Sequence, residues 1–276
     1  MEKYSVLMSV YVKDHPGHLA QSLESMINQT VRPDEIVLVE DGPLNNGLYN
    51  VIGYYKKTYP DLMTVVRLEK NGGLGNALNH GIKAARNELL ARMDADDISL
   101  PHRCEMQLKT FRRMPGLSIA GTQMDEFTDS PECIVSSRIV PSSYKGILRF
   151  SKRRSPFNHP TVMYKKSAVL NAGGYAPHYK RTEDLELFLR MLQKGYRAVN
   201  LKKVYLLYRA DQNNMSRRKS WASCSTYIKI MYRFYKKGYS SSLDMAYVVL
   251  GQLGMYLLPE CIVKKLNGRF LRKQRR

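Results

Sequence analysis

Short apolar runs alternate with segments of helical periodicity along the first third of the chain. The runs that predict buried strands are SVLMSVYV at 5–12, DEIVLVEDG at 34–42, LMTVVRLE at 62–69 and ELLARMDADD at 88–97. Between them, apolar residues recur at helical spacing within 15–30, 47–58 and 71–87. This alternation predicts an α/β fold with a largely parallel sheet, in which ligands bind beyond the carboxyl ends of the strands.

The rest of the chain predicts a mixture of elements. Helices are expected at 98–114 and 182–195, strands at 117–127, 133–140, 196–201 and 203–209, a strand with a short helix at 161–174, and a turn-rich surface loop at 149–160. Ser99 and Thr182 stand at expected N-cap positions, and Pro101 falls in a first helical turn.

Composition divides the chain into two parts. The 276 residues, 43% of them hydrophobic, suffice for one sizeable core. The formal net charge of +20 is concentrated at residues 216–276, where fourteen Lys and Arg face two acids. We therefore expect a globular domain at 1–215 and a basic, partly amphipathic helical region at 216–276. Nucleic acid, an anionic membrane or a phosphorylated substrate would each suit such charge.

The C-terminal region contains a charge-free apolar run at 245–258. The run is shorter than the ~20 residues that span a bilayer. Two interpretations remain: a helix lying on an anionic leaflet, or a helix packed on the domain with a solvated basic tail. The N-terminus lacks the pattern of a secretory signal, and the scattered Cys104, Cys133, Cys224 and Cys261 suggest a reducing cytoplasm.

Three carboxylates, Asp94, Asp96 and Asp97, follow the fourth predicted strand, and Asp41 follows the second. Because parallel strands end at one edge of a sheet, both groups should face the same crevice. Oxygen ligands select hard cations such as Mg²⁺ or Mn²⁺, which also bind phosphate oxygens. The cluster therefore indicates a metal–diphosphate site, although a solvated acidic turn would show the same residues.

Seven motifs in order resemble glycosyltransferase family 2. They span about residues 4–210 and read SVLMSVYVKD, DEIVLVEDGP, NGGLGNALNHGI, ARMDADD, NHPTVMYKKSAV, GGY and TEDLELFLRM. The resemblance implies the GT-A fold, a Rossmann-like, mostly parallel sheet flanked by helices, here with a basic helical C-terminal extension. It also implies a nucleotide-sugar donor and a divalent cation, Mn²⁺ or Mg²⁺.

The resemblance further implies roles for individual residues. The nucleotide sugar is expected to contact Val10, Tyr11, Asp41, Gly73, Asn76, Asp94, Ala95 and Arg209. The DxD-type cluster Asp94, Asp96 and Asp97 is expected to hold the metal. The turn at Gly72, Gly73 and Gly75 opens a helix whose N-terminus favours negative charge, although it is not a dinucleotide fingerprint.

Glu183 and Asp184 match the acidic pair of the family. The resemblance assigns the general base to Asp184, which would take the proton of an acceptor hydroxyl and give inversion at the anomeric carbon. Two acids at a helix N-terminus also complement the helix dipole, which is the competing interpretation. His159 is expected to bind the acceptor, or else to be a solvated loop histidine.

Relatives of this layout imply single addition of a hexose during O-antigen, lipopolysaccharide or capsule assembly. The QxxRW element of processive synthases is absent from the sequence. The expected donor is UDP-galactose or UDP-glucose. The expected acceptor is GlcNAc- or GalNAc-diphospho-undecaprenol, joined by a β linkage, with β1,3 the working choice. The basic C-terminal region and Lys152, Arg153 and Arg154 predict a peripheral enzyme on the inner leaflet of the plasma membrane, with no nucleic acid bound.

Two other functions compete with this interpretation. A sugar-phosphate nucleotidylyltransferase also uses an α/β nucleotide fold, but it needs a Gly- and Arg-rich phosphate loop that SVYVKDHPGH does not supply. A basic nucleic-acid-binding protein would suit the pI near 9.8. That second alternative leaves the acids at the strand ends unexplained.

Overall fold

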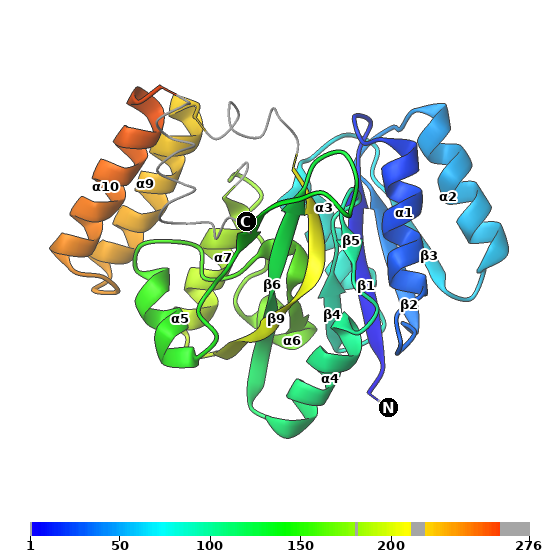
Figure 1. Ribbon diagram of the computed structural model, residues 1–276, viewed down its shortest axis with the longest axis horizontal. Coiled ribbons are helices and arrows are strands. Elements are labelled where there is room, and N and C mark those ends of the chain that lie inside the picture. The colour runs from blue at the N-terminus through cyan, green and yellow to red at the C-terminus, as the bar shows by residue number, and fades with distance from the viewer. Residues whose placement is uncertain (1, 180–181, 211–218, 260–276) are drawn as a thin grey trace.

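The structure is a computed structural model that describes residues 2–179, 182–210 and 219–259 (Figure 1). The strands are β1 (Tyr4–Val10), β2 (Glu35–Glu40), β3 (Met63–Arg67), β4 (Leu89–Arg92), β5 (Ile98–Ser99), β6 (Leu117–Phe127), β7 (Ile134–Arg138), β8 (Met163–Lys165) and β9 (Arg197–Arg209). The helices are α1 (Pro16–Ile27), α2 (Asn46–Thr58), α3 (Leu74–Ala84), α4 (Arg103–Arg113), α5 (Tyr144–Ser151), the 3₁₀ helix η1 (His159–Thr161), α6 (Lys166–Asn171), α7 (Glu183–Gln193), α9 (Trp221–Lys236) and α10 (Ser242–Leu257).

The described strands form one sheet in the order β3-β2-β1-β4-β8-β6-β9-β5, with β7 beside β6. The four strands predicted from the first apolar runs, β3, β2, β1 and β4, are all parallel, as expected. Beyond β4 the sheet is mixed, because β8 runs antiparallel to both β4 and β6 while β6 and β9 are parallel. The predicted α/β fold class is confirmed.

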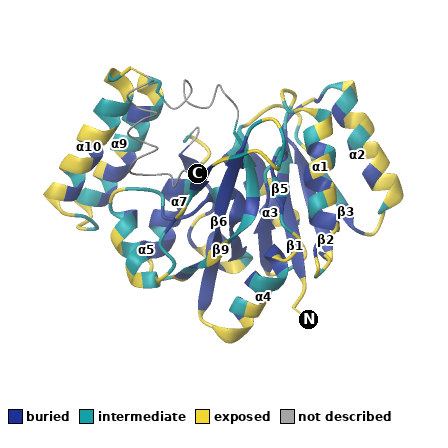
Figure 2. Cartoon of the chain, viewed as in Figure 1, coloured by how far each residue is buried: buried dark blue, intermediate teal, exposed yellow. Residues whose placement is uncertain are grey.

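Helices cover both faces of the sheet, and successive side chains along a strand point to alternate faces. Val6 and Met8 of β1 pack into the core beneath α1, α2 and α4, whereas Leu7 packs into the core beneath α3, α6 and α7. Figure 2 shows the strands as the buried centre of the molecule. A sheet buried on both faces explains why its strands read as continuous apolar runs in the sequence.

Helices α9 and α10 lie side by side at one end of the molecule, next to α7 (Figure 1). Leu185 and Leu189 of α7 pack against Phe234 of α9 and Val248 of α10 in a third, smaller core. None of the described helices has both the length and the apolar character needed to cross a membrane. The boundary predicted between residues 215 and 216 and most of the basic tail lie outside the described residues, so the domain division stays a prediction.

The predicted helix start at Ser99 is wrong. Ser99 belongs to β5, which pairs with β9, and its amide donates to Ser25 Oγ at 3.1 Å. Leu100 and Pro101 also make long-range backbone hydrogen bonds, so α4 begins only at Arg103. Tertiary partners have taken the backbone groups that a helix would need. Thr182 does hold the N-cap position of α7, but its side chain makes no capping hydrogen bond.

Two other predictions of local structure need correction. The late strands expected at 196–201 and 203–209 are one strand, β9, whose register against β6 shifts where Lys202 and Lys203 intervene. The surface loop expected at 149–160 begins inside α5, which Ser143 caps, and it ends in η1. Phe157 and Asn158 of this segment are buried, so much of it belongs to the core.

Candidate active site

A cavity of about 1010 Å³ opens at the carboxyl ends of the parallel strands. Its walls include Tyr11 after β1, Asp41 after β2, Asp94 and Asp96 after β4, and Asp184 at the start of α7. Gly73, Ala95 and Glu183 line it as well. Parallel strands bring their carboxyl ends to one edge, and this is why acids from distant parts of the chain converge here.

Asp41 is tied to the turn that opens α3. Its two carboxylate oxygens accept hydrogen bonds from the amides of Gly72, at 2.8 Å, and Gly73, at 3.0 Å. Gly73 has φ +85°, a conformation that favours glycine. Gly75 lies two residues further on, where an added Cβ would come within 3.4 Å of Glu183 Cβ, so α3 and α7 approach closely at the cavity. Asp41 therefore shapes the turn as well as facing the cavity.

The three aspartates after β4 lie close enough to share a cation. One carboxylate oxygen from each lies within 4.8 Å of those of the other two. Asp94 and Asp96 line the cavity. Asp97 is fully buried behind them: its Oδ1 accepts from the amide of Arg209 at 3.0 Å, and its Oδ2 has no hydrogen-bond partner among the described residues. An all-oxygen set with a buried unpartnered oxygen fits a hard divalent cation.

Burial and mutual repulsion act on this cluster. Burial, followed by the negative charge of Asp94, raises the pKa of Asp96 to about 6. Burial and the charges of Asp96 and Asp94 also raise the pKa of Asp97 well above its ordinary value. A cation among the three carboxylates would favour their charged forms instead.

Two buried arginines that the sequence analysis did not single out support the cluster. Arg92 ends β4 and forms a salt bridge with Asp94, which is the largest favourable influence on the pKa of Arg92 and raises it despite burial. Arg103 begins α4 and donates through Nη2 to the carbonyl of Arg92. In the sequence both look like ordinary surface charges, and only tertiary packing buries them beside the cluster.

Asp184 and Glu183 form the first turn of α7. Asp184 is half-buried on the cavity wall, whereas Glu183 is 5% exposed. Burial raises the pKa of the Asp184 carboxyl, and the Leu185 amide and the positive charges of Arg138 and Arg92 oppose that shift. A carboxylate with a raised pKa in a cavity has the character of a proton acceptor.

Arg209 borders the acid cluster. Among the described residues it does not line the cavity. Its Nε donates to the carbonyl of Asp96 at 3.0 Å and its Nη2 to Gln21 Oε1 at 2.6 Å, while the guanidinium lies 4.6 Å from the centre of the Phe127 ring. These bonds hold the turn of the cluster. Contact with a diphosphate, as expected from the resemblance, stays a prediction.

His159 lies behind the described residues that line the cavity and is not one of them. Its Nε2 is 2.8 Å from the Tyr175 hydroxyl, and its ring packs against Phe188. Burial, together with the charge of Arg92, lowers the pKa of His159 well below its ordinary value. The histidine is therefore not the solvated loop residue considered above, and this arrangement lends no support to direct acceptor binding.

Val10 and Asn76 also stand back from the cavity. Val10 is 1% exposed, and its carbonyl accepts the amide of Asp41 at 2.8 Å, so it joins the ends of β1 and β2. The amide of Asn76 packs where a Cβ on Gly72 would lie, 2.4 Å from it. Both residues support the neighbours that face the cavity.

The cavity has further walls that sequence reasoning missed. Asp14, in the turn after β1, lines it, and burial is the main reason that its pKa is raised to about 7. On the opposite side, the lining includes Arg138, Arg153 and Arg154, and one face of α10. The basic motif at 152–154 was the available signal for Arg153 and Arg154, but nothing in the sequence placed α10 on the wall of this cavity.

Comparison with known proteins places this chain among enzymes of one family. Residues 5–172 match the family model described as glycosyl transferase family 2. Over 273 residues the chain is 35% identical to an Escherichia coli UDP-Gal:α-D-GlcNAc-diphosphoundecaprenol β-1,3-galactosyltransferase, covering 98% of each chain. Over 233 residues it is 37% identical to the amylovoran biosynthesis glycosyltransferase AmsE of Erwinia amylovora, covering 84% of each.

Solved structures share the fold at low sequence identity. S. aureus TarS in complex with UDP-GlcNAc superposes with a TM-score of 0.67 at 19% identity, over 92% of this chain and 72% of that one. The mannosyltransferase PcManGT from Pyrobaculum calidifontis, in complex with GDP-Man and Mn²⁺, gives 0.66 at 16% identity, over 92% of this chain and 70% of that one. Both neighbours have the GT-A fold, so the predicted fold is confirmed.

Proposed function

This chain belongs to glycosyl transferase family 2, as its motifs indicated, and we propose that it moves a single hexose from a nucleotide sugar to a lipid-linked sugar. The observation that carries the proposal is the single cavity that Asp94 and Asp96 share with Asp184. The proposed donor is UDP-galactose, with UDP-glucose the alternative. The proposed acceptor is GlcNAc- or GalNAc-diphospho-undecaprenol, joined by a β1,3 linkage, in O-antigen or capsule assembly.

The nucleotide sugar would occupy the end of the cavity formed by β1, β2 and β4. Tyr11 and Asp41 would contact the nucleoside, and the amides at the start of α3 favour negative charge. Asp94 and Asp96 would hold a divalent cation, with Asp97 completing or supporting its shell. When bound, Mn²⁺ or Mg²⁺ would supply positive charge to the departing nucleoside diphosphate.

Asp184 would act as the general base. Its carboxylate takes the proton of the acceptor hydroxyl as that oxygen bonds to the anomeric carbon, and the bond from that carbon to the nucleoside diphosphate breaks on the opposite side. One displacement of this kind inverts the configuration, so an α-linked donor gives a β product. Arg92 would support the step by fixing Asp94 through their salt bridge.

The proposed acceptor is a membrane lipid, so we infer that the enzyme acts at a membrane surface. The E. coli relative is named for a diphosphoundecaprenol acceptor. A lipid-linked diphosphate is anionic, and so is the leaflet that carries it; each Lys or Arg near such a surface contributes about 1 kcal/mol. We therefore propose a peripheral enzyme on the inner leaflet of the plasma membrane, held in part by the α9–α10 region. Membership of the family leaves the nucleotidylyltransferase and nucleic-acid-binding interpretations without support.

A donor screen tests the proposal. The protein is mixed with Mn²⁺, a panel of nucleotide sugars and a synthetic GlcNAc-diphosphate-lipid, and the product is identified by mass spectrometry. One hexose should be transferred, and EDTA should abolish the transfer until Mn²⁺ or Mg²⁺ is restored. Failure with every nucleotide sugar would refute the proposed function.

Two variants then assign the roles of the acids. Asp96→Ala and Asp184→Ala should each lose nearly all transfer, about 10²–10⁴-fold for loss of a general base. Asp184→Ala should still bind UDP and Mn²⁺, measured by calorimetry. The residues proposed to hold them follow β1, β2 and β4, whereas Asp184 belongs to α7. Retained turnover in Asp184→Ala would reassign the base, with Glu183 the next candidate.

A further inference from the structure

Residues of opposite chemistry line the cavity from two sides of the fold, the strand ends and the side of α5 and α10 (Figure 1). One end carries the carboxylates Asp94 and Asp96. The other carries Arg138, Arg153 and Arg154, together with an apolar wall supplied by α10. The acidic end suits the metal and nucleotide of the proposed function. The basic and apolar end would suit a ligand that is both anionic and apolar.

Residues of α10 hold Arg153 in place, whereas Arg154 packs against α5. Arg153 Nε donates to Asp244 Oδ1 at 2.6 Å, and its guanidinium lies 5.0 Å from the centre of the Tyr247 ring. Asp244 in turn forms the capping box of α10 with Ser241. Arg154 stacks 5.7 Å from the Phe150 ring, and no carboxylate among the described residues forms an ion pair with it. Its positive charge is therefore available to a ligand in the cavity.

The wall that α10 contributes is mostly apolar, with Gln252 its one polar amide side chain among the described lining residues. Tyr247, Gly251, Gly254, Met255 and Leu258 recur at helical spacing and line the cavity together. No charged residue occurs between Met245 and Leu258. An added Cβ on Gly251 would meet nothing within 4 Å, so the glycine leaves open space beside the cavity.

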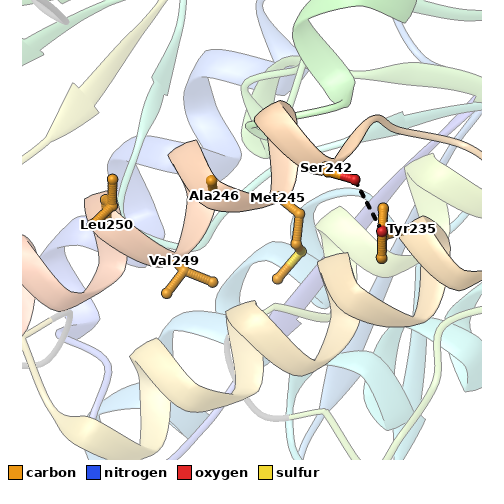
Figure 3. A pocket seen from close by; sticks show the side chains of 6 residues that line it. All are labelled: Tyr235, Ser242, Met245, Ala246, Val249 and Leu250. Atoms are coloured by element: carbon orange, nitrogen blue, oxygen red, sulfur yellow. Dashed lines mark hydrogen bonds between the residues drawn. The ribbon is translucent and has the colours of Figure 1, made fainter.

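The apolar surface continues around α10 and away from the cavity. Leu250 lines the cavity and also a groove of about 400 Å³ between α9 and α10, with Met245, Val249 and Tyr235 (Figure 3). Leu250 is itself 70% exposed. A hydrocarbon chain leaving the cavity over Leu250 would therefore stay on apolar surface.

We propose that this end of the cavity binds the lipid-diphosphate part of the acceptor. Arg154, beside Arg153, binds the phosphates, and the Gly251–Leu258 face of α10 binds the first isoprene units of the chain. This inference rests on the proposed function, because it places the acceptor sugar between the phosphates and Asp184. These are positioning residues that bind the acceptor without touching the reacting atoms.

Binding without turnover tests the inference directly. The probes are farnesyl diphosphate, inorganic diphosphate and farnesol, titrated into the full-length protein by calorimetry in EDTA, so that the acidic end repels diphosphate. The wild-type protein should bind farnesyl diphosphate about tenfold or more tighter than inorganic diphosphate, because the chain buries apolar surface. Farnesol alone should bind weakly.

Two variants separate the contributions. Gly251→Gln places a polar side chain in the open space and should reduce farnesyl diphosphate binding to the level of inorganic diphosphate, leaving the latter unchanged. Arg154→Gln should weaken both about tenfold, since it removes charge-assisted hydrogen bonds. Gly53→Gln, at another helical glycine with open space around it, and Arg149→Gln, at an exposed arginine on α5, are the matched controls and should bind like the wild type.

The outcomes separate this inference from the proposed function. Wild-type affinity of Gly251→Gln for farnesyl diphosphate, or of Arg154→Gln for both anions, overturns the lipid-diphosphate site, even if the donor screen finds transfer. The predicted losses in both variants establish the site. If the same protein then transfers no sugar from any donor, the proposed function fails while the lipid-diphosphate site stands.

Discussion

At the scale of a single residue, the surroundings of Asp184 change the pKa of its carboxyl. Burial raises the pKa of its carboxyl, whereas the Leu185 amide and two arginine charges lower it, and burial dominates. A base must be ionised to accept a proton. If Asp184 is the general base, as proposed, its raised pKa should move the acid limb of the activity profile above the ordinary aspartate value of ~3.9.

We expect transfer to rise with pH along this limb and then to level off. The measurement is kcat against pH at saturating Mn²⁺, which competes with protons for the cluster of Asp94, Asp96 and Asp97. Asp184→Asn should retain only residual activity, and that activity should lack the limb. An unchanged limb in Asp184→Asn would assign the titration to a different group, and Asp14 would be examined next because its pKa is raised to about 7.

Asp41 makes a structural contribution that is separable from donor binding. Asp41→Ala removes the acceptor of the Gly72 and Gly73 amides, so we expect the free energy of unfolding to fall by about 1 kcal/mol. Asp41→Asn keeps one carbonyl oxygen and should lose less. Urea denaturation measures both. If the two variants unfold at the wild-type midpoint, the turn does not depend on this carboxylate.

At the scale of the elements, the small residues of α3 allow the helix to pack closely against the sheet. An added Cβ on Gly81 would lie 2.4 Å from Leu7 Cδ1 and 2.9 Å from Val39 Cγ2, so the helix sits directly on β1 and β2. Gly53 of α2 has open space around it. The two glycines look alike in the sequence, but only one of them is required by packing.

Alanine at these two positions should have opposite effects. Gly81→Ala should destabilise the protein by about 1–3 kcal/mol, because overpacking forces the helix from the sheet. Gly53→Ala should stabilise it by up to about 1 kcal/mol through helix propensity. Thermal and urea unfolding of the pair provide the measurement. A stabilising Gly81→Ala would show that α3 can move away from the sheet at little cost.

Elements were predictable where their pattern was long and periodic. The four parallel strands and the helices at α1, α3 and α7 follow from apolar runs and helical spacing. The two-residue β5 carries no periodicity, and its backbone bonds to β9 are formed across the chain, which is why Ser99 was misplaced. The bulge at Lys202 and Lys203 likewise reads as a gap between strands, although β6 pairs on both sides of it.

At the scale of the whole molecule, the α9–α10 region would join the candidate active-site cavity to the proposed membrane surface. Figure 2 shows α10 as largely exposed, and Leu243, Leu250 and Leu257 are each at least 70% exposed. The small core with α7 holds the region to the domain. The same helix thus presents apolar side chains to its surroundings and lines the cavity.

Removal of residues 240–276 should release the protein from membranes. The measurement is sedimentation with anionic phospholipid vesicles, and neutral vesicles are the control. The intact protein should pellet with anionic vesicles and dissociate as salt rises, since the attraction is electrostatic. The truncated protein should stay in the supernatant and lose activity on lipid-linked acceptor. Truncated protein that still pellets would place the membrane contact elsewhere.

Local periodicity and the order of motifs determined the fold class, the family and the identity of the acids, because strands and helices carry their patterns in neighbouring residues. Tertiary structure alone decided that Asp14 joins these acids in the cavity, that Arg92 and Arg103 are buried beside them, and that His159 stands behind the wall. It also decided that α10 closes the far end. These arrangements depend on contacts between residues far apart in the chain, and such contacts leave no local pattern to read.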